Sequence, residues 1–139
     1  MSDAQVTRQH PRPRLPLQLL AETLAVCRLE AGAPVPSWAE QSSGFLTVSR
    51  TAEELSITAL QEAVPDDLVC ERDYRALRVR GPLPLNLIGI VGAIADPLAE
   101  AGVSIFAIST YDTDYVLVKA ADLETALGAL ERAGHQVSR

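Results

Sequence analysis

The stretch after residue 73 constrains the fold most, because its apolar residues follow a clear helical period between two strand-like segments. We expect a helix that is capped at its start by Asn86 and ends at Gly102. Pro97 falls inside this helix and should either kink the helix or leave the carbonyl of Ala93 without its usual N–H partner. The apolar positions at spacings of three and four are Leu87, Ile88, Val91, Ile94, Leu98 and Ala101.

The elements around this helix complete a known order. Strands are predicted over residues 74–79, 103–109, 115–119 and 135–137, and a second helix follows Asp122. We expect His135 at the end of that second helix, where a cation suits the helix dipole. The resulting β-α-β-β-α-β order is the ferredoxin-like pattern, an antiparallel sheet with both helices on one face.

The first half repeats this pattern in a degraded form. Strands are predicted over residues 21–30, 45–50 and 55–60, with a short helical turn at 36–41. The segment 50–57 aligns with 109–117 if Thr113 is gapped, since each has a strand, a threonine, an acidic turn and a strand. We therefore expect an α+β chain of two tandem βαββαβ halves that form one antiparallel sheet. The halves span residues 17–72 and 73–139, after a disordered tail at 1–16.

Composition excludes several classes of function. The formal net charge of −6 disfavours binding to nucleic acid or anionic lipid. The N-terminus has no apolar signal region, and no apolar run is long enough to span a bilayer, so we expect a cytoplasmic protein. Cys27 and Cys70 are far apart in sequence and are interpreted as reduced, buried and inert thiols.

No catalytic or metal-binding motif is present. The two histidines, His10 and His135, lie in no nucleophile or metal signature. Gly89 and Gly92 lack the third glycine of a dinucleotide-binding loop and are interpreted as helix-packing positions. We therefore expect no catalytic residue, no metal and no cofactor.

Two features favour a small ligand. Asp112 and Asp114 lie in one turn, with Glu53 and Glu54 in its counterpart. Such turns are commonly just solvated, but a carboxylate there could receive an ammonium group. The loop 81–86 precedes a helix start, where unpaired N–H groups favour an anion such as a carboxylate. A free amino acid fits both features.

These segments resemble the ACT domain family. The resemblance rests on Gly81-Pro82-Leu83, the helix from Leu87 and the run from Pro97 to Lys119, and in the first half on Pro36-x-Trp38 and residues 45–57. The chain is most similar to small bacterial tandem-ACT proteins, and the turn 109–114 resembles that of the CASTOR-type arginine sensors.

The resemblance implies a non-catalytic amino-acid-binding regulatory or sensor protein whose ligand lies between ACT modules. It also implies a homodimer and a regulated partner protein. The ligand-binding residues that it implies are Gly81, Leu83, Leu87, Ile88, Ser109, Thr110, Asp112, Thr113 and Asp114, with Thr51, Glu53 and Glu54 as first-half counterparts. The usual Asp-x-Pro-Gly loop of many ACT domains is replaced here by Gly81-Pro82-Leu83-Pro84.

Two other hypotheses stay open at this point. The chain could be a protein–protein interaction module with a vestigial cleft. It could also be a small enzyme that uses Asp112 or Asp114 as a base, although no second catalytic group is visible in the sequence.

Overall fold

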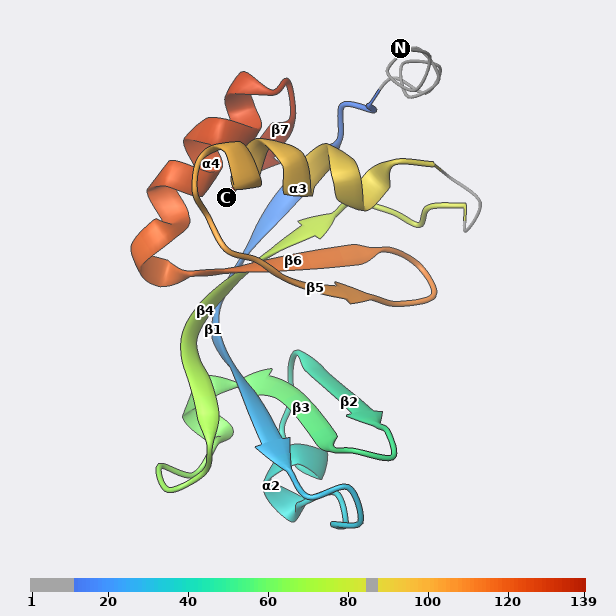
Figure 1. Ribbon diagram of the computed structural model, residues 1–139, viewed down its shortest axis with the longest axis vertical. Coiled ribbons are helices and arrows are strands. Elements are labelled where there is room, and N and C mark those ends of the chain that lie inside the picture. The colour runs from blue at the N-terminus through green and yellow to red at the C-terminus, as the bar shows by residue number, and fades with distance from the viewer. Residues whose placement is uncertain (1–11, 85–87) are drawn as a thin grey trace. The chain divides into compact units, whose positions relative to one another are not determined.

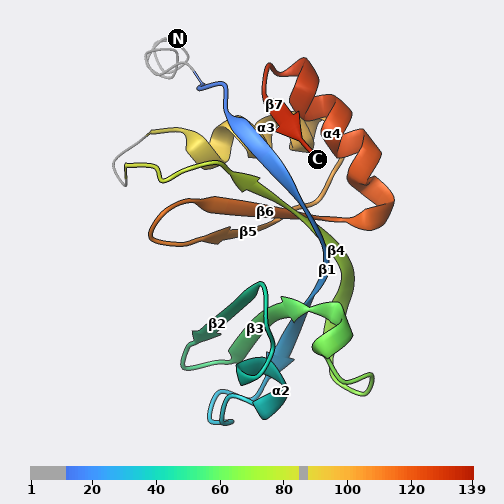
Figure 2. The same cartoon turned by 180° about the vertical axis from the view of Figure 1, so that it is seen from behind.

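The computed structural model describes residues 12–84 and 88–139 (Figures 1 and 2). No helix in these described ranges is long and apolar enough to cross a bilayer. The elements in chain order are β1 (Pro16–Leu29), α2 (Ser37–Glu40), β2 (Leu46–Arg50), β3 (Leu55–Leu60), a 3-10 turn (Gln61–Ala63), β4 (Cys70–Val79), α3 (Ile90–Glu100), β5 (Phe106–Ser109), β6 (Asp114–Lys119), a 3-10 turn (Ala120–Asp122), α4 (Leu123–Arg132) and β7 (Gln136–Ser138).

The chain divides into two compact units. One comprises Ala21–Arg75, and the other joins Ala76–Arg139 to the described residues up to Leu20. The long strands β1 and β4 each contribute to both units. Residues 17–20, which we expected in the first half, therefore belong with the C-terminal unit.

The C-terminal unit has the predicted β-α-β-β-α-β order and is an α+β fold. Its strands are ordered β1-β4-β6-β5, and β7 pairs in parallel with the start of β1. The hairpin of β5 and β6 is antiparallel and pairs Ser109 with Asp114. Helices α3 and α4 contact each other and β6, and they share one apolar core (Figure 2). Its largest fully buried side chains include Leu77, Ile94, Leu98, Leu127 and Leu130.

The start of α3 differs from the prediction. The helix begins at Ile90, and Gly89, with a φ of 80°, occupies the N-cap position that we expected for Asn86. Asn86 and Leu87 lie outside the described residues. Glycine suits this position because L side chains rarely adopt a positive φ.

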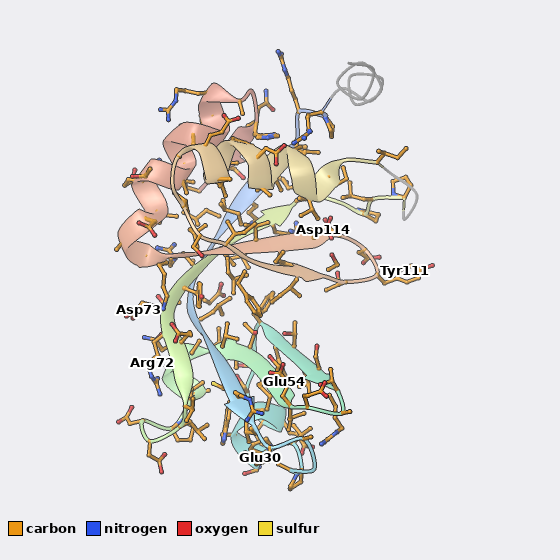
Figure 3. All side chains as sticks on the ribbon, viewed as in Figure 1. Glu30, Glu54, Arg72, Asp73, Tyr111 and Asp114 are labelled. Atoms are coloured by element: carbon orange, nitrogen blue, oxygen red, sulfur yellow. The ribbon has the colours of Figure 1, made fainter. Side chains whose placement is uncertain are left out.

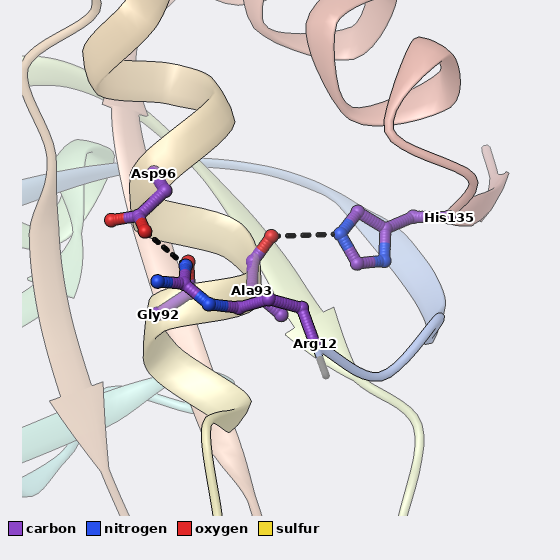
Figure 4. Close-up of polar contacts among 5 residues, drawn as sticks. All are labelled: Arg12, Gly92, Ala93, Asp96 and His135. Carbon is purple, nitrogen blue, oxygen red and sulfur yellow. Dashed lines mark hydrogen bonds and ion pairs between the residues drawn. The ribbon is translucent and has the colours of Figure 1, made fainter. Parts of the chain in front are cut away.

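The expected tail is also partly wrong. Leu15 is only 6% exposed and belongs to the C-terminal core. Arg12 donates a 2.7 Å hydrogen bond to the carbonyl of Gly92 and forms an ion pair with Asp96 (Figure 4). Residues 12–16 therefore pack against the unit, and residues 1–11 lie outside the described ranges.

We expected His135 to be a cation at a helix end, and this expectation is wrong. The side chain is buried and links two backbone groups through hydrogen bonds. Its Nδ1 accepts a 3.0 Å hydrogen bond from the N–H of Leu15, and its Nε2 lies 2.9 Å from the carbonyl oxygen of Ala93 (Figure 4). Nδ1 must be unprotonated to accept, so the network assigns a neutral ring with its proton on Nε2. The carbonyl that Pro97 deprives of a helical partner is thus satisfied by His135.

The N-terminal unit has a smaller core. Its strands are ordered β2-β3-β1-β4, and both β1–β3 and β2–β3 pair antiparallel. Leu55 and Ile57 are fully buried in this core, and the half-buried Trp38 of the short helix α2 packs against the core. Between β3 and β4 this unit has only the 3-10 turn Gln61–Ala63 among its described residues.

Candidate functional site

The loop after β4 is attached to the tip of the β5–β6 hairpin. The N–H of Leu83 donates a 2.8 Å hydrogen bond to the carbonyl of Asp112. A Cβ atom on Gly81 would lie 3.0 Å from the nitrogen of Leu83 and 3.2 Å from the oxygen of Asp112. Because both neighbours are backbone atoms, a side chain at this position would require the loop or the hairpin to shift by a few tenths of an ångström.

The side chain of Thr113 attaches the hairpin turn to the end of β4. Its side chain is buried, and its hydroxyl donates a 2.5 Å hydrogen bond to the carbonyl of Val79 at the end of β4. Within the turn, the N–H of Thr110 donates to the carbonyl of Thr113 at 2.8 Å. The hydroxyl of Thr113 is therefore engaged with the protein's own backbone.

The carboxylate of Asp114 is oriented by a neighbour across the hairpin. The hydroxyl of Ser109 donates a 2.5 Å hydrogen bond to Oδ1 of the half-buried Asp114. The side chain of Asp112 is exposed, and Tyr111, 82% exposed, projects from the tip of the hairpin (Figure 3). The carboxylate of Asp114 is thus fixed by a hydrogen bond, whereas the carboxylate of Asp112, on the same turn, is exposed to solvent.

The N-terminus of α3 forms the opposite wall. None of the described side chains caps this helix, and its first turn contains no acidic residue. The N–H of Ala93 donates a hydrogen bond to the carbonyl of Gly89, four residues earlier. The amides that precede it in the helix carry the positive end of the helix dipole, so this end favours an anion.

The loop after β4, the hairpin turn and the start of α3 together line an open depression of about 420 Å³. This volume lies in the range of small-ligand pockets. Among the described residues, its lining includes no histidine, lysine, arginine or cysteine. The lining residues are Leu83, Pro84, Gly89, Ile90, Val91, Gly92, Ser109, Thr110, Tyr111, Asp112, Thr113 and Asp114.

The structure gathers most of the predicted second-half residues at this depression. Leu83 and the five predicted turn residues line it, and Gly81 supports the loop beside the hairpin. Ile88 is 62% exposed and does not belong to the lining, and Leu87 lies outside the described residues. Thr51, Glu53 and Glu54 belong to the N-terminal unit and are not part of the lining.

Sequence reasoning expected the helix start to favour an anion, but it did not name Gly89, Ile90, Val91, Gly92 or Tyr111 as lining residues. Gly89 and Gly92 are the signal that could have revealed this wall, because small residues at a helix start leave its N–H groups accessible. They were interpreted only as packing positions.

The two hairpin turns correspond without a gap. Arg50 pairs with Leu55, and Ser109 pairs with Asp114, so four residues form each turn. In the first turn, the N–H of Thr51 donates to the carbonyl of Glu54 at 2.9 Å, as Thr110 does to Thr113. The expected gap at Thr113 is therefore wrong, and the position that corresponds to Asp114 is the buried Leu55.

Comparisons with known proteins agree with this architecture. The sequence profile of the ACT domain matches residues 69–132, and a second profile, described as an N-terminal domain, matches residues 22–67. The solved structure of protein Atu0741 from Agrobacterium tumefaciens is 35% identical, with a TM-score of 0.85, and the match covers 91% of this chain and 93% of that one.

Two further relatives are more distant. The human "Cytosolic arginine sensor for mTORC1 subunit 1" is 32% identical over 94 residues, which is 64% of this chain but only 27% of that protein. The regulatory subunit of aspartate kinase from Thermus flavus shares the fold at 13% identity and a TM-score of 0.61, covering 87% of this chain and 99% of that one.

Proposed function

Because this chain is a member of the ACT domain family, with its ACT domain at residues 69–132, we propose that it is a non-catalytic regulatory protein that binds a free amino acid. The observation that carries the proposal is the depression between the acidic turn 109–114 and the start of α3, which none of the described side chains caps. The relative named as an arginine sensor supports the same class of ligand.

The two walls match the two charges of a zwitterion. The α-carboxylate of the ligand would accept hydrogen bonds from the first amides of α3, where the dipole is positive. The α-ammonium would bind the carboxylate of Asp114, which Ser109 holds in position. Asp112 would remain near the ligand's side chain and would favour a cationic or polar one.

The proposal includes a doubled architecture. We infer that the N-terminal unit is a degraded ACT-like module, because its turn at Thr51–Glu54 repeats the turn at Thr110–Thr113. We propose that the open side of the depression is covered by another ACT-type module, supplied by a homodimer, and that ligand binding regulates a partner protein in the cytoplasm. A ligand achieves this only if it binds the two states of the protein with unequal affinity.

Isothermal titration of the full chain against each of the twenty amino acids tests the proposal. We expect at least one to bind, and Asp114→Asn to weaken that binding by about 2 kcal/mol through loss of a charge-assisted hydrogen bond. Asp66→Asn is the matched control, because Asp66 is exposed in the other unit. Silence across the whole set at millimolar concentrations, or equal affinity of the Asp114 variant, would contradict the proposal.

A second candidate function is favoured by exposed apolar side chains beside the depression. Ile88 is 62% exposed, Val91 37% and Tyr111 82%. Such a group suits a protein–protein contact in which the depression holds no metabolite. This alternative predicts a partner protein whose binding Tyr111→Ser weakens, with no heat in any amino-acid titration.

A further inference from the structure

The two cysteines of the N-terminal unit lie in direct contact. Cys27 on β1 and Cys70 on β4 are 43 residues apart in sequence, yet their Sγ atoms are 2.9 Å apart. The residues next to the two cysteines are also hydrogen-bonded to each other: the N–H of Arg28 donates a 3.1 Å hydrogen bond to the carbonyl of Val69. Both are free thiols here. The interpretation of both as buried thiols is wrong for Cys70, which is half-buried, and their separation in sequence gave no sign of this contact.

The two thiols differ in accessibility. Cys27 is 1% exposed, and burial, with the hydrogen bond to Cys70 as the next cause, raises the pKa of Cys27 to about 12. Cys70 is half-buried, so it is the more accessible of the two thiols to a small oxidant. This asymmetry gives each cysteine a separate role, because oxidants attack the accessible sulfur first and the neighbouring thiol then resolves the product.

We propose that Cys27 and Cys70 form a redox-active pair that hydroperoxides convert into a disulfide. The Cys70 thiolate attacks one oxygen of hydrogen peroxide and the O–O bond breaks. The sulfur becomes a sulfenic acid, and the released hydroxide takes up a proton to give water. The Cys27 sulfur then attacks the Cys70 sulfur, the S–O bond breaks, and a second water leaves with the proton of Cys27. Two thiols lose two electrons, and the peroxide is reduced to two waters.

The consequence is local to the N-terminal unit. The bond would close the chain between Cys27 and Cys70, a loop that holds α2, β2 and β3 and spans most of Ala21–Arg75. A cross-link around a loop of this length stabilises the fold chiefly by restricting the unfolded chain. The proposal rests on the geometry of the thiols and is independent of amino-acid binding.

Oxidation of the full chain with a small excess of hydrogen peroxide tests the pair. We expect both thiols to disappear together, with loss of the mass of two hydrogen atoms and one peptide that joins Cys27 to Cys70. The midpoint of thermal unfolding should rise by about 5–10 °C and return after treatment with dithiothreitol.

Single variants separate the two roles. In Cys27→Ala, Cys70 should accumulate as a sulfenic acid that dimedone traps. In Cys70→Ser, Cys27 should stay reduced because it is buried. The proposal is overturned if the wild-type chain keeps both thiols, or if its Cys70 proceeds to sulfinic acid or to a disulfide between chains. The wild-type measurement decides the question even if a variant fails to fold.

Discussion

At the scale of single residues, Thr113 shows how one hydroxyl organises the candidate site. It joins the acidic turn to the end of β4 through the carbonyl of Val79, and only 6% of the residue is exposed. The sequence places this threonine in a ligand-binding turn by resemblance. It could not reveal the bond to Val79, because that contact joins residues 34 positions apart.

Replacing Thr113 by valine should destabilise the chain by about 1–2 kcal/mol, because it removes a buried hydrogen bond and leaves a carbonyl short of a donor. Urea unfolding measures the loss. Thr113→Ser keeps the hydroxyl and is the matched control, so it should lose less. A valine variant as stable as the wild type would show that the bond contributes nothing.

The pH dependence of stability should show the burial of Cys27. The folded chain keeps this thiol protonated up to about pH 12, whereas the unfolded thiol ionises near pH 9. Between these values the unfolded state releases a proton that the folded state retains. The stability that the protonated Cys27 thiol contributes is therefore fully present below about pH 9 and is lost as pH rises from there toward about 12.

Urea unfolding under reducing conditions, compared between wild type and Cys27→Ala across this alkaline range, isolates the contribution. The wild type should lose stability more steeply as pH rises. Parallel curves for the two proteins would contradict the buried, protonated thiol.

At the scale of elements, the β-α-β-β-α-β order of the C-terminal unit could be predicted, and β3 was predicted with its observed bounds, because period and turn residues are local signals. The start of α3 could not be predicted, since Asn86 offers a better cap by propensity than Gly89. The hydrogen-bond donor to the Ala93 carbonyl could not be predicted from the sequence either. Pro97 shows that a donor is missing, but only the folded chain brings His135 to it.

His135→Ala should therefore destabilise the C-terminal unit by about 2–4 kcal/mol. It leaves the N–H of Leu15 and the carbonyl of Ala93 without partners and opens a cavity. Thermal or urea unfolding measures the effect, and Gln136→Ala, at the exposed neighbouring position, is the control. If both variants are equally stable, the bridge has no energetic role.

At the scale of the whole molecule, two sequence profiles divide the chain near residue 68, and each compact unit has a hydrophobic core of its own. The sequence suggested the doubled pattern that we propose, because a threonine opens both acidic turns. It could not suggest that the two turns differ, since buried Leu55 corresponds to Asp114 only once the strand register is known. The described residues that line the candidate amino-acid site all lie in the C-terminal unit.

Association of the chain should depend on Tyr111. A side chain that is 82% exposed beside a ligand depression is a strong candidate for burial by a second copy. Tyr111→Ser should raise the dimer dissociation constant about tenfold or more, as truncation of an interface aromatic commonly does. Sedimentation equilibrium measures it, with Val69→Ser, another exposed apolar position, as the control. Equal association of both variants with the wild type would place the interface elsewhere.

The binding of a zwitterion between α3 and the acidic turn is tested most directly by following backbone amides in an NMR titration with each amino acid. The account predicts that one ligand shifts the amides of Ile90, Val91 and Gly92 together with those of the turn 109–114, and that Asp114→Asn abolishes these shifts at the same concentration. If no amino acid moves the amides at the start of α3, or if the shifts cluster in the N-terminal unit instead, the account is contradicted.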